Sequence, residues 1–357
     1  MNFQNNTNTL QDFSDFLILK SASVREALER MNSRGLDVIL FVVDNDLQLI
    51  GSLTDGDVRR GLLKGLGLEH TVDEFVHASP KVIVKGQYEI RDIIKLRENL
   101  YKVIPVVDQT NRILRVINFR YLKSYLPLDA VIMAGGRGSR LRPMTDTLPK
   151  PLLKVGDKPI MEHNVDRLRK FGVDDFWVSL RYRGEQIEAY FEDGRDKQVN
   201  IQYIWENEPL GTIGAINKVH NFKHDYILVT NSDLLTTLDY EDFFLNFIDQ
   251  KADMSVATIP YSIDVPYAVM ETVDNNVVSF KEKPTYTYYS NGGIYLIKKE
   301  LLRMIPKDTF FNSTDLMEAV IERGMKLISY PVRGYWLDIG KPEDFTKAQT
   351  DIGHLEL

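Results

Sequence analysis

A short apolar run followed at once by glycines is the feature of this 357-residue sequence that most restricts its fold. Residues 128–134 read LDAVIMA, and Gly135, Gly136 and Gly138 come directly after them. A run of this length between Pro127 and a glycine is typical of a strand inside a sheet. Glycines at the carboxyl end of such a strand let the backbone approach a phosphate, and their N–H groups can line an anion site.

Beyond this strand, apolar segments with strand character alternate with amphipathic helical segments. Strands are expected at residues 175–180, 199–205 and 226–231, and helices at 160–171, 184–191 and 211–219. Alternation of this kind predicts an α/β fold with a Rossmann-like mixed, mostly parallel sheet and helices on both faces.

The region before residue 127 contains an internal repeat at an offset of 64 residues, seen where LFVVD at 40–44 matches IPVVD at 104–108. A helical segment precedes each copy, at 24–33 and at 90–100. A second β-branched run and a second helical segment follow in each. The repeat therefore predicts an α+β unit that occurs twice.

This repeat resembles a tandem pair of CBS domains, covering residues 14–126. The match is most specific in the segment GSLTDGD, which contains Thr54 and Asp57. In that family the corresponding Thr and Asp hold the ribose of an adenine nucleotide, and a hydroxyl and a carboxylate can both accept from ribose hydroxyls. The second copy has Asn118 and Tyr121 at these positions, so at most one cleft is expected to bind. The alternative is that both copies serve only packing or dimerisation.

Composition excludes several other classes of function. The net charge of −7 argues against nucleic-acid binding, and the lack of cysteine excludes disulfides, thiolate metal sites and a cysteine nucleophile. The first residues do not form a basic stretch followed by an apolar core, and runs such as 38–43 are too short to cross a bilayer. We expect a cytoplasmic protein with no membrane or nucleic-acid partner.

Two basic residues follow the glycine loop. Arg140 offers a fork-shaped cation suited to phosphate, and Lys150 lies between Pro149 and Pro151 in a stiff, extended segment. The loop has neither the Gly-Lys-Ser/Thr ending of a Walker motif nor the spacing of a dinucleotide fingerprint, which counts against a kinase or a dehydrogenase. Loop and cations together predict a clamp for phosphates.

At this point residues 128 to about 345 resemble the sugar-phosphate nucleotidylyltransferases. In that family the loop Arg and the motif Lys stabilise charge in the transition state, and the resemblance gives these roles to Arg140 and Lys150. The sugar phosphate oxygen attacks the α-phosphorus in line and pyrophosphate leaves, without a covalent intermediate. The family's loop wraps the triphosphate, and its residues here are Gly135, Gly136, Gly138 and Ser139.

The resemblance also implies a magnesium ion and a sugar site. Asp233, just after the strand at 226–231, and Asp338 correspond to the family's magnesium ligands. The motifs that contact the sugar and its phosphate correspond here to Glu282, Lys283, Asn291 and Gly293.

The segment WENEPLGT resembles the family's base-reading loop, and it contains Glu206, Pro209 and Gly211. Members that use UTP or dTTP tend to have Gln at the position of Glu206. A carboxylate only accepts hydrogen bonds, and guanine presents two adjacent donors, so we hypothesise GTP, with UTP or dTTP as the alternative. A CBS pair ahead of the transferase is similar to the glucosamine-1-phosphate guanylyltransferases of legionaminic acid biosynthesis. Mannose 1-phosphate and heptose 1-phosphate remain open as substrates.

The expected organisation is a flexible tail at 1–13, the CBS pair at 14–126 and the nucleotidyltransferase domain at 127–357. We expect a homo-oligomer that uses a nucleoside triphosphate and a sugar 1-phosphate, with an adenine nucleotide at the CBS pair. The competing hypothesis is a non-catalytic nucleotide sensor. It predicts loss of Arg140, Lys150 or the aspartates, and all of these are present.

Overall fold

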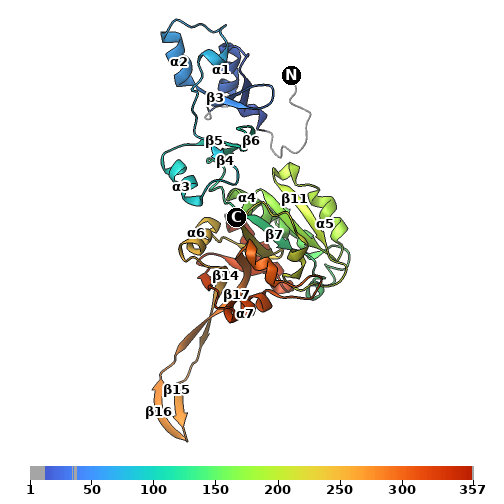
Figure 1. Cartoon of the computed structure of the whole chain (residues 1–357). Coiled ribbons are helices and arrows are strands. Elements are labelled where there is room, and N and C mark those ends of the chain that lie inside the picture. The colour runs from blue at the N-terminus through green and yellow to red at the C-terminus, as the bar shows by residue number, and fades with distance from the viewer. Residues whose placement is uncertain (1–12, 34, 36–37, 356–357) are drawn as a thin grey trace. The chain divides into compact units, whose positions relative to one another are not determined.

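The computed structural model describes residues 13–33, 35 and 38–355 (Figure 1). Nearly all of the tail expected at 1–13 therefore lies outside the described residues. The chain divides into two compact units. Unit 1 contains Met1–Pro127, Leu168–Asp175 and Glu192–Ile201, and unit 2 contains Leu128–Arg167, Phe176–Phe191 and Gln202–Leu357.

Unit 1 contains two three-stranded sheets of the same design. The first has β1 (Leu17–Leu19), β2 (Ile39–Val43) and β3 (Leu49–Thr54), with helices α1 (Val24–Ser33) and α2 (Asp55–Leu63). The second has β4 (Ile83–Val84), β5 (Val103–Val107) and β6 (Ile113–Asn118), with helix α3 (Ile90–Glu98). In each sheet the first two strands are parallel and the last two antiparallel. A bulge falls between Val42 and Val43 in one and between Val106 and Val107 in the other, which confirms the repeat.

The two sheets pack against one another through a shared apolar core. It includes Phe41 and Val43 from the first repeat and Val107, Ile113 and Val116 from the second, all buried. The turns also pair, since the N–H of Leu49 donates to the carbonyl of Asn111 and that of Ile113 to the carbonyl of Leu47, both at 3.0 Å. The repeats therefore fold as a pair.

The prediction of a second helix in the second repeat is wrong. Helix α2 begins at a capping box in which Thr54 and Asp57 satisfy each other's N–H groups. At the matching position the side chain of Asn118 instead accepts from the N–H of Arg120 at 3.0 Å, which closes a turn. Without the reciprocal carboxylate, residues 119–126 form turns and irregular chain.

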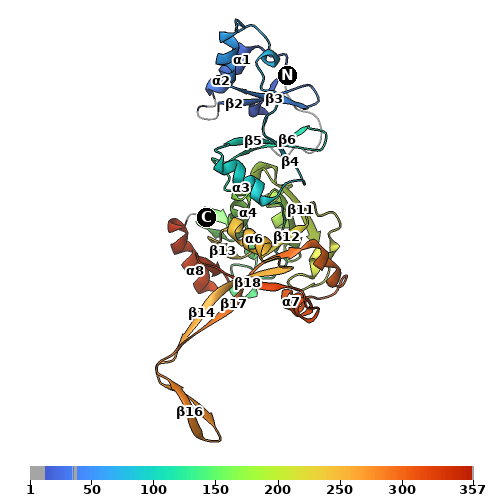
Figure 2. The ribbon, with the colours of Figure 1, turned by 60° about the vertical axis from the view of Figure 1, so that its left-hand side comes forward.

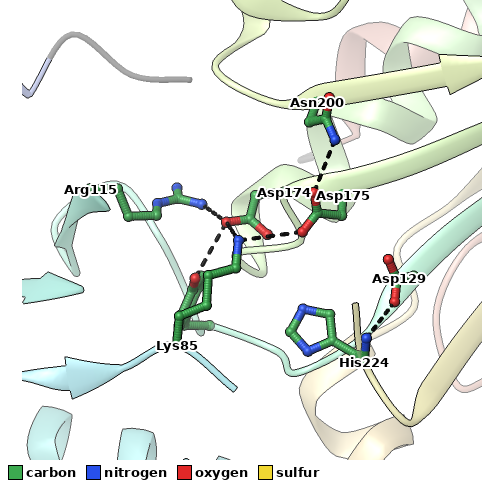
Figure 3. A network of polar contacts seen from close by, with 8 residues as sticks. Lys85, Arg115, Asp129, Asp174, Asp175, Asn200 and His224 are labelled. Atoms are coloured by element: carbon green, nitrogen blue, oxygen red, sulfur yellow. Dashed lines mark hydrogen bonds and ion pairs between the residues drawn. The ribbon is translucent and has the colours of Figure 1, made fainter. Parts of the chain in front are cut away.

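Unit 1 also contains a buried network of charges (Figure 3). Asp174 pairs with the guanidinium of Arg115 and accepts from the hydroxyl of Tyr125 at 3.3 Å, and Lys85 Nζ lies 3.4 Å from Asp175 Oδ2. Burial alone would lower the pKa of Lys85, but the Asp174 carboxylate holds it above its ordinary value. Removing one member would leave an uncompensated buried charge, so the network fixes these segments of unit 1 together.

Unit 2 is built on a seven-stranded mixed sheet in the order β11-β10-β7-β12-β17-β14-β18. The central strands β10, β7 and β12 are parallel, β17 is antiparallel to both of its neighbours, and β14 is parallel to β18. The strands are β7 (Asp129–Met133), β10 (Asp175–Leu180), β11 (Asn200–Trp205), β12 (Tyr226–Asn231), β14 (Met254–Asp264), β17 (Thr285–Lys298) and β18 (Leu327–Pro331). The predicted α/β fold with a mixed, mostly parallel sheet is confirmed.

Helices flank this sheet, and among those described none is long and apolar enough to span a bilayer. The α-helices are α4 (Ile160–Lys170), α5 (Gly184–Phe191), α6 (Tyr240–Asp249), α7 (Ser313–Glu322) and α8 (Pro342–Asp351). The 3-10 turns of unit 2 are η3 (Ser139–Leu141), η4 (Lys150–Leu152), η6 (Gly214–Lys218), η7 (Lys299–Met304) and η8 (Ile352–His354), and those of unit 1 are η1 (Ser14–Phe16), η2 (Val72–Glu74) and η5 (Arg195–Lys197). Two small ladders join β8 (Lys154–Val155) to β9 (Lys158–Pro159) and β13 (Leu234–Thr236) to β19 (Trp336–Asp338).

The prediction of a helix at 211–219 is wrong, because the segment forms only the short 3-10 turn η6. Gly211 has a φ of +78°, and a Cβ added there would lie 2.5 Å from the carbonyl oxygen of Phe311. The backbone is pressed against a neighbouring loop at this point, which prevents a helix from starting at Gly211.

A long two-stranded ribbon leaves the sheet of unit 2. The pairing of β14 with β17 continues as far as Asp264 and Thr285, well past the last buried residues of either strand. A second antiparallel pair, β15 (Val269–Val273) and β16 (Asn276–Lys281), forms its tip. Both views show the ribbon projecting from the body of unit 2 (Figures 1 and 2).

Candidate active site

A pair of short strands brings two distant aspartates together. In the β13–β19 ladder Leu234 lies opposite Asp338, and the N–H of Ile339 donates to the carbonyl of Asp233 at 3.0 Å. The intervening apolar residues anchor both strands, since Leu235, Leu337 and Ile339 are buried in one cluster. The structure therefore places both predicted metal ligands at one edge of unit 2.

Lys150 reaches the same place. Its Nζ donates to Oδ2 of Asp233 and lies 3.8 Å from Oδ1 of Asp338. The side chain is only 10% exposed. Pro149 and Pro151 hold the short η4 turn that carries it, so the ammonium is fixed relative to the carboxylates.

Arg140 completes the group from the glycine loop. Its neighbour Leu141 is fully buried in the same apolar cluster as Leu337 and Ile339. The guanidinium lies beside Gly340, where an added Cβ would be 3.3 Å from Nη1. Arg140 itself is exposed, so its positive charge faces outward beside the aspartates, where an anion can approach.

The carboxylates fit a divalent cation. Oδ1 of Asp233 and Oδ1 of Asp338 are buried and accept no hydrogen bond from the described residues. Burial raises the pKa of Asp338, the charge of Asp233 raises it further, and Lys150 and Arg140 act in the opposite direction. Paired carboxylate oxygens that lack donors are the ligands that a hard cation prefers.

The glycines of the loop have separable roles. Gly138 has a φ of +61°, and a Cβ there would lie 3.0 Å from Lys150 Cβ and from Thr145 Cγ2. A Cβ on Gly135 would meet Glu206 Oε1 at 3.0 Å. Around Gly136 there is nothing within 4 Å. Packing therefore requires glycine at positions 135 and 138. Gly136, like the exposed Ser139, borders open space.

The buried side chain of Glu206 links two elements, and Glu206 is also the residue predicted to contact the base of the nucleotide. One carboxylate oxygen accepts from the hydroxyl of Ser179 in β10, and the other accepts from the N–H of Leu210 at 3.0 Å. The residue is 8% exposed. It therefore holds the loop at 206–210 against β10 and Gly135.

The rest of this loop is clamped by the segment before α7. The N–H of Phe311 donates to the carbonyl of Leu210 at 3.0 Å, and the N–H of Thr212 donates to Oδ1 of Asn312 at 3.3 Å. Gly211 permits this close approach, and Pro209 is exposed beside it. These hydrogen bonds hold the loop against the segment before α7.

Asn291 and Gly293 lie at the same edge as Asp233. The N–H of Gly293 donates to Oδ1 of Asn291 at 2.9 Å. With a φ of +72°, Gly293 packs so tightly that an added Cβ would be 2.6 Å from Nδ2 of Asn231. Nε1 of Trp336 donates to the carbonyl of Gly292 at 2.9 Å, which ties this strand to β19.

Glu282 and Lys283 are not brought to this group. They lie between β16 and β17 on the projecting ribbon, and both are exposed. The contacts of their motif stay within the ribbon: Lys281 Nζ lies 6.0 Å from the ring centroid of Tyr286, and the N–H of Val265 donates to the carbonyl of Pro284 at 3.0 Å. The sugar-phosphate role predicted for this pair stays a prediction.

The CBS candidates have a structural role. The N–H of Thr54 donates to Oδ2 of Asp57 at 2.9 Å, and the N–H of Asp57 donates to the Thr54 hydroxyl at 3.3 Å. Burial alone would raise the pKa of Asp57, but the hydrogen bonds that its carboxylate accepts from the Thr54 hydroxyl and N–H, together with the Arg60 guanidinium, hold it below its ordinary value. The pair caps α2, and its ribose-binding role stays a prediction.

Sequence reasoning missed the residues that hold the site in place. Ser179 orients Glu206, Thr145 donates to the carbonyl of Gly138 at 2.9 Å, and Trp336 fixes Gly292. Ser179 lies in a predicted strand, next to the apolar Val178 and Leu180, and a buried hydroxyl there was a usable signal. The other two carry no local signal.

Comparison with known families gives two matches. Residues 129–354 match the family described as nucleotidyl transferase, and residues 15–64 match the CBS domain. A crystal structure described as a glucose-1-phosphate thymidylyltransferase from Bacillus anthracis superposes with a TM-score of 0.52 at 23% identity, over 64% of this chain and 97% of that one. At that identity it supports the fold.

Three curated relatives match the same region. A D-glycero-alpha-D-manno-heptose 1-phosphate guanylyltransferase from Aneurinibacillus thermoaerophilus is 32% identical, over 64% of this chain and 99% of that protein. A mannose-1-phosphate guanyltransferase from Schizosaccharomyces pombe is 32% identical, over 61% and 62%. A UTP–glucose-1-phosphate uridylyltransferase from Synechocystis is 30% identical, over 62% of each. The chain thus spans about three-fifths of the last two proteins.

Enzymes of the matched family usually use a divalent metal, which agrees with the paired aspartates. The match covers the glycine loop, Lys150, Asp233 and Asp338 together. With its CBS domain at residues 15–64, this chain belongs to the nucleotidyl transferase family, among the sugar-1-phosphate nucleotidyltransferases.

Proposed function

We propose that this enzyme transfers GMP from GTP to a sugar 1-phosphate, giving a GDP-sugar and pyrophosphate. The observation that carries the proposal is the convergence of Lys150, Asp233 and Asp338 beside Arg140 on the glycine loop. Two of the relatives above are named as guanylyl transferring enzymes, which supports GTP over other triphosphates.

In this proposal the glycine loop wraps the triphosphate, with Gly136 and Ser139 at its open side. Arg140 and Lys150 neutralise the charge that builds up on the phosphates. An oxygen of the sugar phosphate forms a bond to the α-phosphorus, the bond from that phosphorus to the bridging oxygen breaks, and pyrophosphate leaves. Asp233 and Asp338 would hold Mg²⁺, which would supply further charge neutralisation.

Glu206 supports a guanine base through its acceptors. Each carboxylate oxygen has a second lone pair beyond those that receive Ser179 and Leu210. These lone pairs can accept the two adjacent donors of guanine. UTP remains the second candidate, because one relative is named as a uridylyltransferase.

The sugar would bind at the edge formed by Asn291 and Gly293, close to Asp233. Glucosamine, mannose and heptose 1-phosphates are the proposed class. Glu282 and Lys283 would contact the sugar and its phosphate only if the ribbon reaches an active site.

The CBS pair is proposed to regulate the enzyme by binding an adenine nucleotide at Thr54 and Asp57. A nucleotide bound there would accept hydrogen bonds from the Arg60 side chain. It would also compete with the capping contacts for hydrogen bonds to the Asp57 carboxylate. We also propose a cytoplasmic location, where nucleoside triphosphates are supplied.

The experiment measures pyrophosphate release with Mg²⁺ from each of four nucleoside triphosphates, crossed with glucosamine, mannose and heptose 1-phosphates. We expect release with GTP and at least one sugar, and none without a sugar. An Asp338→Asn variant should need a higher Mg²⁺ concentration for half-maximal rate. Release with UTP alone would replace the guanylyl assignment, and no release with any pair would overturn the proposal.

A further inference from the structure

An unpaired positive charge lies at the carboxyl end of β10. Arg181 follows the last residue of this strand, and its side chain is half-buried. Among the residues that the structure describes, its guanidinium has no hydrogen-bond acceptor and no ion-pair partner. Arg183 differs, because it donates to the Tyr182 hydroxyl at 3.2 Å and to the carbonyl of Asp146 at 2.6 Å. A half-buried guanidinium has five N–H donors that need acceptors, so Arg181 is suited to a ligand.

Arg181 lies between the two loops that the proposed function assigns to the nucleotide. On one side of β10, the carbonyl of Ser179 accepts from the N–H of Ala134, just before the glycine loop, at 3.0 Å. On the other side, the carbonyl of Leu180 accepts from the N–H of Glu206 at 2.9 Å. The chain therefore leaves β10 with the glycine loop on one side and the proposed base-reading loop on the other.

The side chains of Arg181 and Glu206 border the same point beside Gly135. A Cβ added to Gly135 would lie 3.4 Å from Arg181 Cβ and 3.0 Å from Glu206 Oε1. Side chains two residues apart along a strand share a face, and the hydroxyl of Ser179, two residues before Arg181, donates to that same oxygen of Glu206. A ligand that covers Gly135 would therefore meet a guanidinium and a carboxylate next to each other.

We propose that Arg181 donates to N7 and O6 of the guanine base, which presupposes that the enzyme uses GTP as its proposed function requires. Guanine presents four groups in an unbroken row: the acceptors N7 and O6, followed by the donors N1–H and N2–H. A guanidinium fork pairs with N7 and O6, and a carboxylate accepts from N1–H and N2–H. Arg181 and Glu206 offer these two partners side by side, in the order that guanine needs.

This pair of side chains selects against other bases in two ways. Adenine has an amino group in place of O6 and an acceptor in place of N1–H, so it would set donor against donor at Arg181 and acceptor against acceptor at Glu206. Uracil has no counterpart of N7, so one arm of the guanidinium fork would lose its acceptor. Arg181 would therefore add to the selection for guanine that Glu206 alone provides.

A phosphate is the other group of a nucleotide that a guanidinium can bind. Arg140 and Lys150 already supply the proposed phosphate clamp, whereas Arg181 borders the carboxylate of Glu206, which would repel a phosphate. The two ligands also have different consequences. All nucleoside triphosphates carry the same phosphates, so a phosphate contact would favour every one of them alike, whereas a contact with N7 and O6 favours GTP.

The test compares the full chain with its Arg181→Met variant on two altered triphosphates. 7-Deaza-GTP lacks N7, and inosine triphosphate lacks the 2-amino group. We expect the wild type to show a kcat/KM for GTP about five- to tenfold above that for 7-deaza-GTP, and Arg181→Met to reduce this ratio below about twofold. The ratio for GTP over inosine triphosphate, which reports on the contact with Glu206, should stay the same in both. Equilibrium titration of the same triphosphates without a sugar phosphate should give the same pattern without turnover.

Arg183→Met is the matched control, because it removes a guanidinium from the same segment that already has partners. Its ratio for GTP over 7-deaza-GTP should equal that of the wild type. Equal losses for GTP, UTP and 7-deaza-GTP in Arg181→Met would assign Arg181 to the phosphates and overturn its role in base recognition, while GMP transfer would stand. A wild type that uses or binds 7-deaza-GTP as well as GTP would overturn that role without any variant. A wild type that prefers UTP would overturn both this role and the proposed function.

Discussion

At the scale of single residues, Lys150 has two partners whose charges it must balance. It is 10% exposed and contacts Asp233, and it lies 3.8 Å from Asp338. We predict that Lys150→Met lowers kcat/KM by about 10²–10³, because a fixed cation near the phosphates is lost. Lys154→Met, at an exposed lysine nearby, should stay within about twofold of wild type. Steady-state pyrophosphate release measures both, and equal loss in the two variants would contradict the role.

The loop glycines allow packing and ligand binding to be separated. Gly138→Ala places a Cβ 3.0 Å from Lys150 and Thr145 at a φ of +61°, so we predict a loss of about 1–2 kcal/mol in the free energy of unfolding. Gly136→Ala meets nothing within 4 Å, so Tm should not change. Its KM for the triphosphate should still rise several-fold. Thermal unfolding and kinetics of both variants check this, and an unchanged KM in Gly136→Ala would remove that residue from the site.

The proposed role of Glu206 in base recognition can be tested separately from its hydrogen bonds to Ser179 and Leu210. Glu206→Gln keeps an oxygen that can accept from Ser179 or Leu210, so the fold should survive. We predict that the ratio of kcat/KM for GTP over UTP falls at least tenfold, because the added amide donor faces the donors of guanine. Ser179→Ala is the control: it loosens the tie without adding a donor, so it should affect both triphosphates alike. An unchanged ratio with an unchanged Tm would show that Glu206 does not read the base.

At the scale of elements, the start of α2 depends on Thr54 and Asp57. Thr54→Ala should lower the free energy of unfolding by about 1 kcal/mol, the usual cost of a lost N-cap. The folded-state pKa of Asp57 is depressed, so its contribution is present above about pH 4 and is lost as pH falls through the folded pKa. Chemical denaturation from pH 7 to pH 3 should therefore show a shallower acid limb in Asp57→Asn. An identical acid limb would mean that Asp57 is not a stabilising contact.

Several helices and strands could be predicted from the sequence because the local pattern of apolar and polar residues determines them. The expected strands at 175–180 and 226–231 and the helix at 184–191 have the bounds found for β10, β12 and α5. The helix expected at 211–219 failed because a tertiary contact at Gly211 outweighs the local preference. The prediction of a second helix in the second repeat failed because Asn118 closes a turn where that helix was expected to begin.

The residues of the candidate active site come from segments that lie far apart in the chain, so local sequence patterns predict the site less well than they predict single helices and strands. Asp233 and Asp338 meet through β13 and β19, strands of three residues that leave almost no periodic signal. The resemblance to a family implied that both aspartates bind one magnesium ion, but their contacts with Lys150 were not predicted and spacing in the chain would not have revealed them. The position of Glu282 and Lys283 could not be anticipated, because it depends on how far the β14–β17 ladder continues beyond the sheet.

At the scale of the whole molecule, the chain joins a pair of repeats, the first of which matches the CBS domain, to a transferase domain. The repeats share one apolar core and the transferase has its own, which agrees with the division of the chain into two compact units. The ribbon of unit 2 carries several exposed apolar side chains, among them Tyr261, Met270 and Phe280.

The central claim is that the bond broken lies between the α- and β-phosphates, and position-specific labelling tests it most directly. Parallel reactions would contain GTP labelled with ³²P at either the α- or the γ-phosphate, together with Mg²⁺ and an active sugar 1-phosphate. We expect the α label to appear in the GDP-sugar and the γ label in pyrophosphate. Transfer of the γ label to the sugar phosphate, or release of the γ label as inorganic phosphate alone, would contradict it.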